Sequence, residues 1–118
     1  MRVELNRFRI KRGKSDRVDE WMKTLNDRRN ECLATLERER MYVEVIFRER
    51  TSEDEFLYWF SIQGEDAEPI QTSAHAIDRT HLEFWAECID SEYGPRECDP
   101  QLVLLQQSVA KAIGWEGA

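Results

Sequence analysis

Three segments of the chain, residues 2–11, 41–48 and 56–63, have the hydrophobic pattern of β-strands. Apolar and polar residues alternate along the first segment, the second has one apolar and one mixed face, and the third is apolar on both faces. The polar residues 51–54 separate the second segment from the third, so we expect these two strands to form a hairpin. A fourth segment, 101–107, has a continuous apolar centre and predicts a buried strand.

Two further segments repeat their apolar residues at helical spacing. The first covers residues 16–36, where Ser15 is a suitable N-cap and Asp16 favours the helix dipole. The second covers residues 78–89 and ends before the turn at 93–95. Its apolar face includes one ionisable residue, and its members are Ile77, His81, Phe84, Trp85, Cys88 and Ile89.

The resulting order, β-α-β-β-α-β, is that of a ferredoxin-like α+β domain. We therefore expect one domain over residues 1–118, with a four-stranded antiparallel sheet and both helices on one face. An apolar C-terminal tail at about 108–118 is expected to dock, in part as a short helix. The strand at 56–63 is apolar on both faces, whereas the helices cover only one face of the sheet. A second copy of the chain is the simplest cover for the other face, so we expect a homodimer, with the tail around Trp115 as the alternative cover.

The composition excludes several classes of protein. The formal net charge of −7 argues against a nucleic-acid partner. No apolar run approaches the length of about 20 residues that spans a bilayer, and the first residues lack the apolar stretch of a signal peptide. The three cysteines, Cys32, Cys88 and Cys98, show neither disulfide nor zinc-site spacing, so a reducing cytoplasm is the expected location. No glycine-rich phosphate loop or nucleophile elbow is present, and we expect no cofactor.

Short motifs along nearly the whole chain carry a family resemblance. They are Asn6-Arg7-Phe8-Arg9-Ile10-Lys11, Trp21-Met22, Met41-Tyr42-Val43-Glu44, Leu57-Tyr58-Trp59 and Asp78-x-x-His81-Leu82-Glu83-Phe84-Trp85. Together they resemble a small bacterial family known only as a domain of unknown function. Proteins of this kind look like members of the dimeric α/β-barrel superfamily, in which two ferredoxin-like sheets pair into a barrel. The resemblance implies the fold that the pattern predicts, and it names no reaction.

A fainter similarity concerns the second helix. The segment from His81 to Glu87 is similar to a helix motif of L-rhamnose mutarotases, His-x-x-aliphatic-Trp-x-Glu, which contains their acid–base histidine. Phe84 takes the aliphatic position here. In the mutarotases this motif lies on the first helix, whereas here it lies on the second, which the internal pseudo-symmetry of the fold relates to the first. The similarity implies acid–base chemistry by His81 at the anomeric carbon of a sugar.

His81 has two interpretations. With an ordinary pKa near 6.5 it could transfer a proton at neutral pH. The more common role for such a residue is a core histidine that is hydrogen-bonded to a carboxylate or a backbone carbonyl. Asp78, one turn earlier, could orient His81, although an N-cap role is the more typical one for aspartate. The spacing of His75, Asp78 and His81 does not converge on one helix face, so we expect no metal site.

Two charged residues are further candidates for a ligand site. Glu44 could serve as a second acid or base, or, if its face meets a dimer interface, it could pair across that interface with Arg7 or Arg9, and the second role is slightly favoured. Arg29 falls between apolar positions of the first helix and could bind a polar ligand through its forked guanidinium group. The commoner arrangement for such an arginine is to lie along the helix and carry its charge to water.

Aromatic residues complete the candidate site. Tyr58, Trp59 and Trp85 could stack on a sugar ring, although aromatic residues at these spacings are core residues far more often. Two function classes therefore remain open. The first is a small cofactor-free enzyme that acts on a small polar molecule, such as a sugar, with His81 and Glu44 as its acid–base pair. The second is a non-catalytic dimer that binds a metabolite or a protein.

Overall fold

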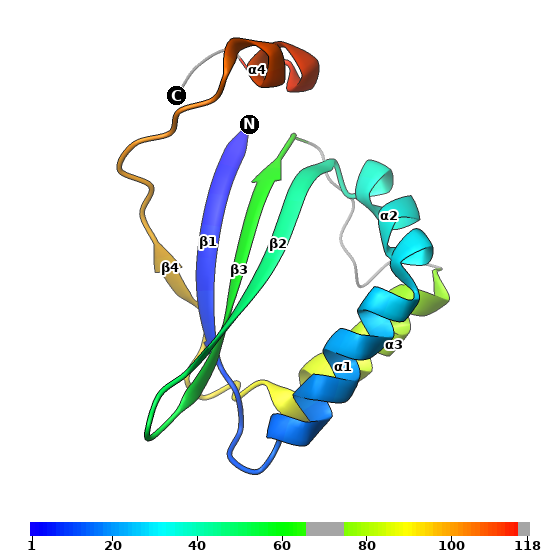
Figure 1. Ribbon diagram of the computed structural model, residues 1–118, viewed down its shortest axis with the longest axis vertical. Helices are drawn as coiled ribbons and strands as arrows, with labels where there is room; N and C mark the ends of the chain where they lie inside the picture. The colour runs from blue at the N-terminus through cyan, green and yellow to red at the C-terminus, as the bar shows by residue number, and fades with distance from the viewer. Residues whose placement is uncertain (66–74, 116–118) are drawn as a thin grey trace.

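The computed structural model describes residues 1–65 and 75–115 of the chain. Its strands and helices follow the order that the sequence pattern predicts, except that the first helix is divided and the fourth strand lies earlier than expected (Figure 1). They are β1 (Arg2–Arg9), α1 (Ser15–Asp27), α2 (Arg29–Arg38), β2 (Met41–Arg50), β3 (Glu55–Gln63), α3 (Ala76–Cys88), β4 (Arg96–Cys98) and α4 (Gln107–Ile113).

The four strands form one sheet in the order β2-β3-β1-β4, and every neighbouring pair is antiparallel. This order places β3 between β1 and β2, as the split β-α-β unit of a ferredoxin-like domain requires. The fold is therefore α+β and ferredoxin-like, which confirms the prediction from the sequence pattern. None of the described helices is long and apolar enough to cross a membrane.

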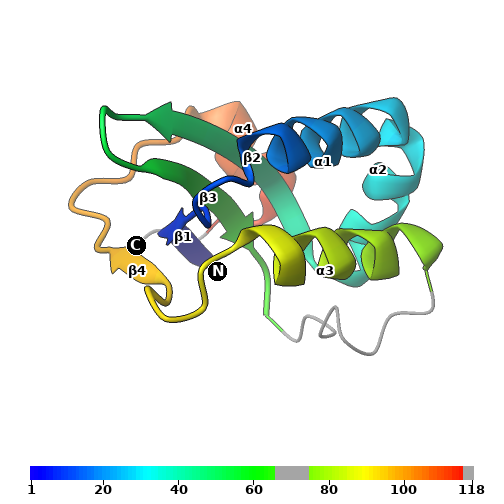
Figure 2. The same cartoon turned by 90° about the horizontal axis from the view of Figure 1, so that it is seen from below.

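Helices α1 and α3 lie next to each other on one face of the sheet, and α2 continues from α1 toward the start of β2 (Figure 2). The core between the helices and the sheet is centred on side chains that are fully buried: Val18, Trp21, Leu57 and Cys88. Val18 and Trp21 are three residues apart on α1, so both point to the sheet. Leu57 meets them from β3.

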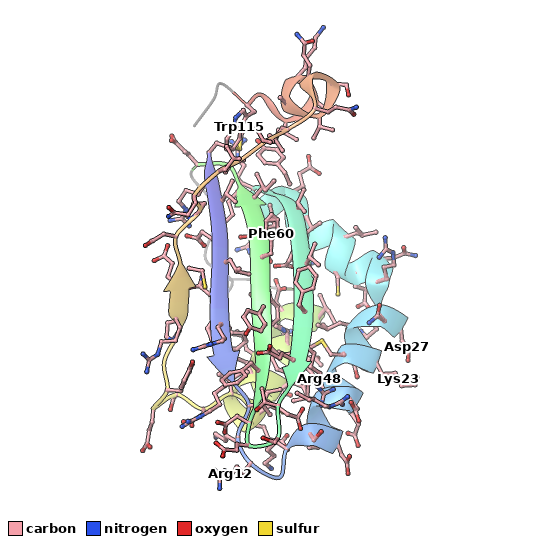
Figure 3. All side chains as sticks on the ribbon, turned by 60° about the vertical axis from the view of Figure 1, so that its left-hand side comes forward. Arg12, Lys23, Asp27, Arg48, Phe60 and Trp115 are labelled. Atoms are coloured by element: carbon pink, nitrogen blue, oxygen red, sulfur yellow. The ribbon has the colours of Figure 1, made fainter. Side chains whose placement is uncertain are left out.

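The opposite face of the sheet carries apolar side chains that no described helix covers. Phe47 on β2 is 55% exposed and lies opposite Tyr58, while Val45 is 37% exposed and lies opposite Phe60. Figure 3 looks onto this face, with Phe60 on β3 and Trp115 near the end of the sheet. The tail forms the expected short helix, α4, but α4 lies beyond the end of the sheet where β1 begins (Figure 1). It leaves the centre of this face open.

The predicted helix over residues 16–36 is two helices, with a break at Arg28. The backbone N–H of Arg28 still bonds to the carbonyl of Thr24, but its φ and ψ of −105° and 34° end the helical path. Residues 26–31 are all polar, so no buried side chain holds this part of the chain in line with α1. The break turns α2 toward β2, where Cys32 and Leu25 line a common cleft.

The predicted strand at 101–107 is wrong. The fourth strand is instead β4, which comes earlier and pairs with β1 through Leu5 opposite Cys98. Leu102 and Leu104 lie in a segment without regular structure and are 76% and 81% exposed. The apolar run therefore marks an exposed segment, whereas the polar strand beside Pro95 has no periodicity that could reveal it.

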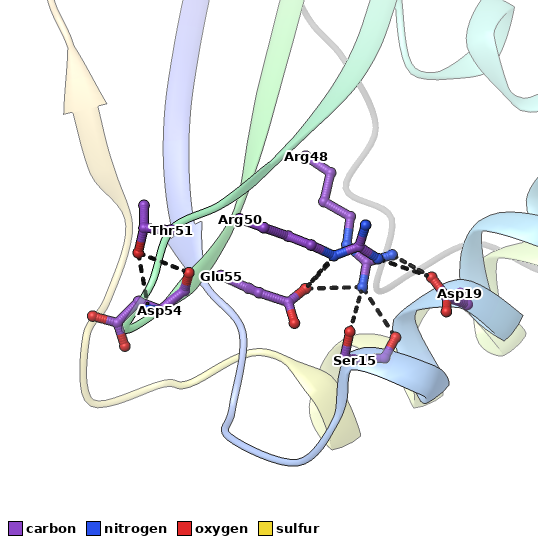
Figure 4. Close-up of polar contacts among 7 residues, drawn as sticks. All are labelled: Ser15, Asp19, Arg48, Arg50, Thr51, Asp54 and Glu55. Atoms are coloured by element: carbon purple, nitrogen blue, oxygen red, sulfur yellow. Dashed lines mark hydrogen bonds and ion pairs between the residues drawn. The ribbon is translucent and has the colours of Figure 1, made fainter.

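An arginine on β2 ties the hairpin to the start of α1 (Figure 4). The side chain of Arg48 is 17% exposed and forms ion pairs with Asp19, at 2.5 Å, and with Glu55, at 2.9 Å. It also donates to the backbone oxygen and to the hydroxyl of Ser15, both at 3.0 Å. Ser15 is thus the first residue of α1 and a hydrogen-bond partner of the hairpin. The prediction that Ser15 is the N-cap is wrong, because the N-cap residue is Lys14, which forms no side-chain cap bond.

Candidate functional site

A small inner pocket lies between the helices and the sheet, beside His81. Its volume is about 60 Å³, which is enough for one or two water molecules or for one functional group of a ligand. Leu25, Ile46 and Ile77 form apolar parts of its wall. The polar and aromatic side chains that line it come from α2 and its C-cap residue, from β2 and β3, and from α3. They are Thr35, Glu39, Glu44, Trp59, Asp78 and His81.

The inner pocket adjoins an open cleft of about 320 Å³ between α1, α2 and β2. Both cavities share the side chains Leu25, Cys32, Glu44 and Ile46 as walls. Arg29, exposed at the start of α2, lines only the outer cleft. The volume of the cleft is in the range of small-molecule sites in proteins, so the two cavities together can accept a small ligand whose tip enters the pocket.

His81 lies on the second turn of α3 and has a defined hydrogen bond. Its Nδ1 accepts from the indole N–H of Trp21 at 3.1 Å. For a core histidine we expected a carboxylate or a backbone carbonyl as the partner, whereas the partner here is an indole N–H. Burial lowers the pKa of His81 to about 4, and the nearby charge of Asp78 opposes this shift. His81 is therefore neutral at pH 7, with Nδ1 occupied as an acceptor and the proton on Nε2.

Glu44 shares the inner pocket with His81. It lies on the helix-facing side of β2, exposed toward the outer cleft, and its Oε2 accepts from the indole N–H of Trp59 at 3.1 Å. Desolvation raises the pKa of the Glu44 carboxyl, while the bond from Trp59 opposes the rise. Arg7 and Arg9 lie on the other face of the sheet, where Arg9 pairs with Asp90 at 2.7 Å. Glu44 therefore does not lie on the open sheet face with these arginines, and its expected pairing with them across a sheet-to-sheet interface is wrong.

Glu39 is a pocket residue that the sequence did not single out. It follows α2 as the C-cap residue, within a run of alternating charges at 37–40 that gives no sign of burial. Desolvation raises the pKa of Glu39 to about 7, with a further contribution from the negative charges of Glu44 and Asp78. Its carboxyl group therefore gains and loses a proton near neutral pH.

Asp78 is also buried in the pocket wall. His75 is the N-cap of α3, so the N-cap role expected for Asp78 is wrong. Asp78 lies in the first turn instead and is only 5% exposed, and its Oδ2 has no hydrogen-bond partner among the described residues. A buried carboxylate oxygen without a donor is costly, which makes this atom an open acceptor beside the pocket.

The predicted aromatic wall is divided between three places. Trp59 lines the inner pocket. Trp85 lies deeper, where it packs edge-on against Phe8 with ring centroids 4.6 Å apart, and it does not line the pocket. Tyr58 lies on the opposite face of the sheet, and its hydroxyl donates to Glu49 at 2.7 Å. The structure thus brings His81, Glu44 and Trp59 together, puts Arg29 at the outer cleft, and separates Tyr58 from them.

The pocket offers acid–base groups. Across residues 1–65 and 75–115, no group of three histidine, cysteine, aspartate or glutamate side chains is arranged so that it could hold a metal ion. The Nε2–H of His81 can donate a hydrogen bond, Glu44 can accept one, and Glu39 can exchange a proton near pH 7. These groups suit a ligand with hydroxyl or amino groups.

Comparison with known proteins agrees with the fold. The crystal structure of an L-rhamnose mutarotase from Formosa agariphila is similar to this structure with a TM-score of 0.55, over 91% of this chain and 100% of that chain. The sequence identity is 15%, so the likeness concerns the fold alone. No curated protein matches the sequence. The model of a family of unknown function, DUF6176, matches residues 1–111, and the chain therefore belongs to that family.

Proposed function

We propose that this protein is a small cofactor-free enzyme that performs acid–base chemistry on a small polar molecule, as a mutarotase does on a sugar. The observation that carries the proposal is the convergence of Glu39, Glu44 and His81 on one pocket that joins an open cleft. The likeness to an L-rhamnose mutarotase supports the fold on which such a site would be built.

The three groups divide the work of proton transfer. Exchange at an anomeric carbon opens and closes the sugar ring, which adds a proton at one oxygen and removes a proton from another. Glu39, whose pKa is about 7, is suited to one of these steps, and Glu44 is suited to the other. Because His81 is neutral, its role is to donate a hydrogen bond from Nε2 to the reacting oxygen. Trp59 forms an aromatic wall beside it.

Anomeric exchange of free sugars tests this proposal directly. Two-dimensional exchange NMR measures interconversion of the α and β forms of L-rhamnose and other aldoses with and without the protein. We expect acceleration by the natural protein, and a loss of about 10²-fold or more in Glu39→Gln and in His81→Gln. Glu37→Gln and His75→Gln are the matched controls, since both residues are exposed outside the pocket.

Two results would argue against this function. Equal exchange rates in Glu39→Gln and Glu37→Gln would remove Glu39 from the chemistry. Binding of a sugar in the pocket without faster exchange for any aldose would instead favour the alternative, a non-catalytic metabolite-binding protein. Chemical-shift changes at the indole N–H of Trp59 report such binding, since Trp59 lines the pocket.

A homodimer forms part of the same proposal. The open sheet face exposes Val45 and Phe47, and a monomer seldom leaves a contiguous apolar surface of this kind in water. A second copy stacked sheet on sheet would cover this face of both chains. We place the protein in the cytoplasm, because its three cysteines are all free thiols, including the buried Cys88.

A further inference from the structure

The buried carboxylate of Asp78 indicates what kind of group the pocket receives. This side chain is 5% exposed, and its Oδ2 has no hydrogen-bond donor among the residues that the structure describes. The atom does not cap the helix, because His75 is the N-cap residue of α3 and Oδ2 of Asp78 accepts no hydrogen bond from the described backbone. A buried carboxylate oxygen normally has a hydrogen-bond donor, and a bound ligand can supply one at this position.

Two more carboxyl groups face the same pocket. Glu39 and Glu44 line it together with Asp78. Desolvation and then the negative charges of Glu44 and Asp78 raise the pKa of Glu39, while desolvation and then the charge of Asp78 raise the pKa of Glu44. Among the described residues that line the pocket, none is a lysine or an arginine. His81 adds no positive charge at neutral pH, since its Nδ1 already accepts from Trp21. The pocket is therefore an acceptor-rich site with an excess of negative charge.

We infer that the inner pocket binds a protonated amine, whose ammonium group lies between Asp78, Glu39 and Glu44. An ammonium group has three N–H donors and no acceptor, so it can donate to carboxyl groups on more than one side of the pocket, whereas a hydroxyl group has one donor. Its positive charge also removes the repulsion between the carboxylates. Trp59 in the pocket wall adds an aromatic surface of the type that attracts cations.

The dimensions restrict the rest of the ligand. The inner volume of about 60 Å³ holds an ammonium group with one or two carbon atoms and excludes a sugar ring. The ring or chain of the ligand would lie in the outer cleft of about 320 Å³. Taken with the proposed function, on which this step rests, the substrate class is a small polyhydroxylated amine such as an amino sugar.

Small ions test the ammonium site without any assumption about the substrate. Methylammonium chloride is added to isotopically labelled protein, and the signals of the Trp59 indole N–H and the His81 ring are followed by NMR. The comparison probes are sodium chloride at the same ionic strength and methanol at the same concentration, with sodium chloride added to keep the ionic strength equal. We expect saturable shifts in the millimolar range with methylammonium and none with the other two. Equal shifts with sodium chloride, or no saturable shift with methylammonium, would overturn the inference.

Variants assign the effect to the carboxyl groups. Asp78→Asn is expected to weaken methylammonium binding by about tenfold or more, because it replaces a charged acceptor. Glu39→Gln is a second variant for the case in which Asp78→Asn fails to fold. Asp99→Asn, at an exposed position after β4, is the matched control and should bind as the natural protein does. Unchanged binding in both pocket variants would place the methylammonium elsewhere and contradict the site.

A matched series of sugars separates this inference from the proposed function. D-glucosamine carries the ammonium group, N-acetyl-D-glucosamine replaces it with a neutral amide, and D-glucose replaces it with a hydroxyl. We expect the pocket signals to respond to glucosamine at concentrations at least about tenfold lower than to the other two. Accelerated anomeric exchange of glucose with no preference for glucosamine would leave the enzyme proposal standing and overturn the ammonium site.

Discussion

The indole N–H of Trp21 donates a hydrogen bond of 3.1 Å to Nδ1 of His81, which links α1 to α3 across the core. The two rings lie with centroids 5.4 Å apart. Trp21 is fully buried, so this bond satisfies a donor that would otherwise lack a partner. For His81 the bond fixes one tautomer, because only the neutral ring can accept at Nδ1 while it carries a proton on Nε2.

Replacing Trp21 with phenylalanine should therefore change the titration of His81. A donor at Nδ1 favours the neutral ring, so its loss should raise the pKa of His81 from about 4 toward its ordinary value near 6.5. The smaller ring should also reduce the free energy of unfolding by about 1–3 kcal/mol. NMR titration of the His81 ring and chemical denaturation measure the two effects. Trp115→Phe in the C-terminal tail is the control, and an unchanged His81 pKa in Trp21→Phe would contradict the role of the bond.

His81 and Glu39 should give opposite contributions to the pH dependence of stability. Between pH 4 and 6.5 the unfolded chain binds more protons at His81 than the folded protein does, so the free energy of unfolding rises with pH. At Glu39, whose pKa rises from 4.5 to about 7, the folded protein binds more protons between these values, so the free energy of unfolding falls with pH. Each slope is at most about 1.4 kcal/mol per pH unit, and in the natural protein they offset each other between pH 4.5 and 6.5.

Two variants separate these slopes. His81→Gln leaves the Glu39 contribution, so its stability should fall as the pH rises from 4.5 to 7. Glu39→Gln leaves the His81 contribution, so its stability should rise from pH 4 to 6.5. Urea denaturation at half-unit pH intervals measures both profiles. Parallel profiles in the two variants would show that the pocket does not shift these pKa values in opposite directions.

Part of the site could be predicted from sequence because it follows helical and strand periodicity. His81 was found as an ionisable residue on an apolar helix face, and Glu44 as an acid between apolar residues of a strand. Both lie at the inner pocket. Glu39 could not be found in this way, because its burial depends on the break at Arg28 that turns α2 toward β2. Periodicity reports which side of one element is apolar, but it does not report how two elements meet.

The same limit explains the error in the fourth strand. The order of the first three strands and two helical segments was confirmed, since each carries its own amphipathic pattern. β4 has three residues and is exposed along its length, so its pairing with β1 depends on tertiary position and not on an apolar face. The run around Leu104 has strand-like composition, but no partner among the described elements buries it.

Arg48 should contribute more to stability than its neighbour Arg50, although both pair with Asp19 and Glu55. The Arg48 side chain is 17% exposed and also bonds to Ser15, whereas that of Arg50 is 58% exposed. We expect Arg48→Met to lower the free energy of unfolding by about 1–3 kcal/mol, since it leaves a half-buried Glu55 with a weaker partner. Arg50→Met should cost less than about 1 kcal/mol. If urea denaturation shows the same loss of unfolding free energy in both variants, the additional contacts of Arg48 contribute no more to stability than those of Arg50.

The open sheet face should control assembly through Phe47. This side chain is 55% exposed opposite Tyr58, so a second copy that covers the face would bury it, and a lysine there would place an unpaired charge in the interface. We expect the natural protein to sediment as a dimer at micromolar concentrations and Phe47→Lys to sediment as a folded monomer. Leu33→Lys is the matched control, because Leu33 is 47% exposed on α2 and lies away from this face. Two outcomes would contradict a dimer formed through this face. One is a natural protein that sediments as a monomer, and the other is equal dissociation of the dimer by Phe47→Lys and Leu33→Lys.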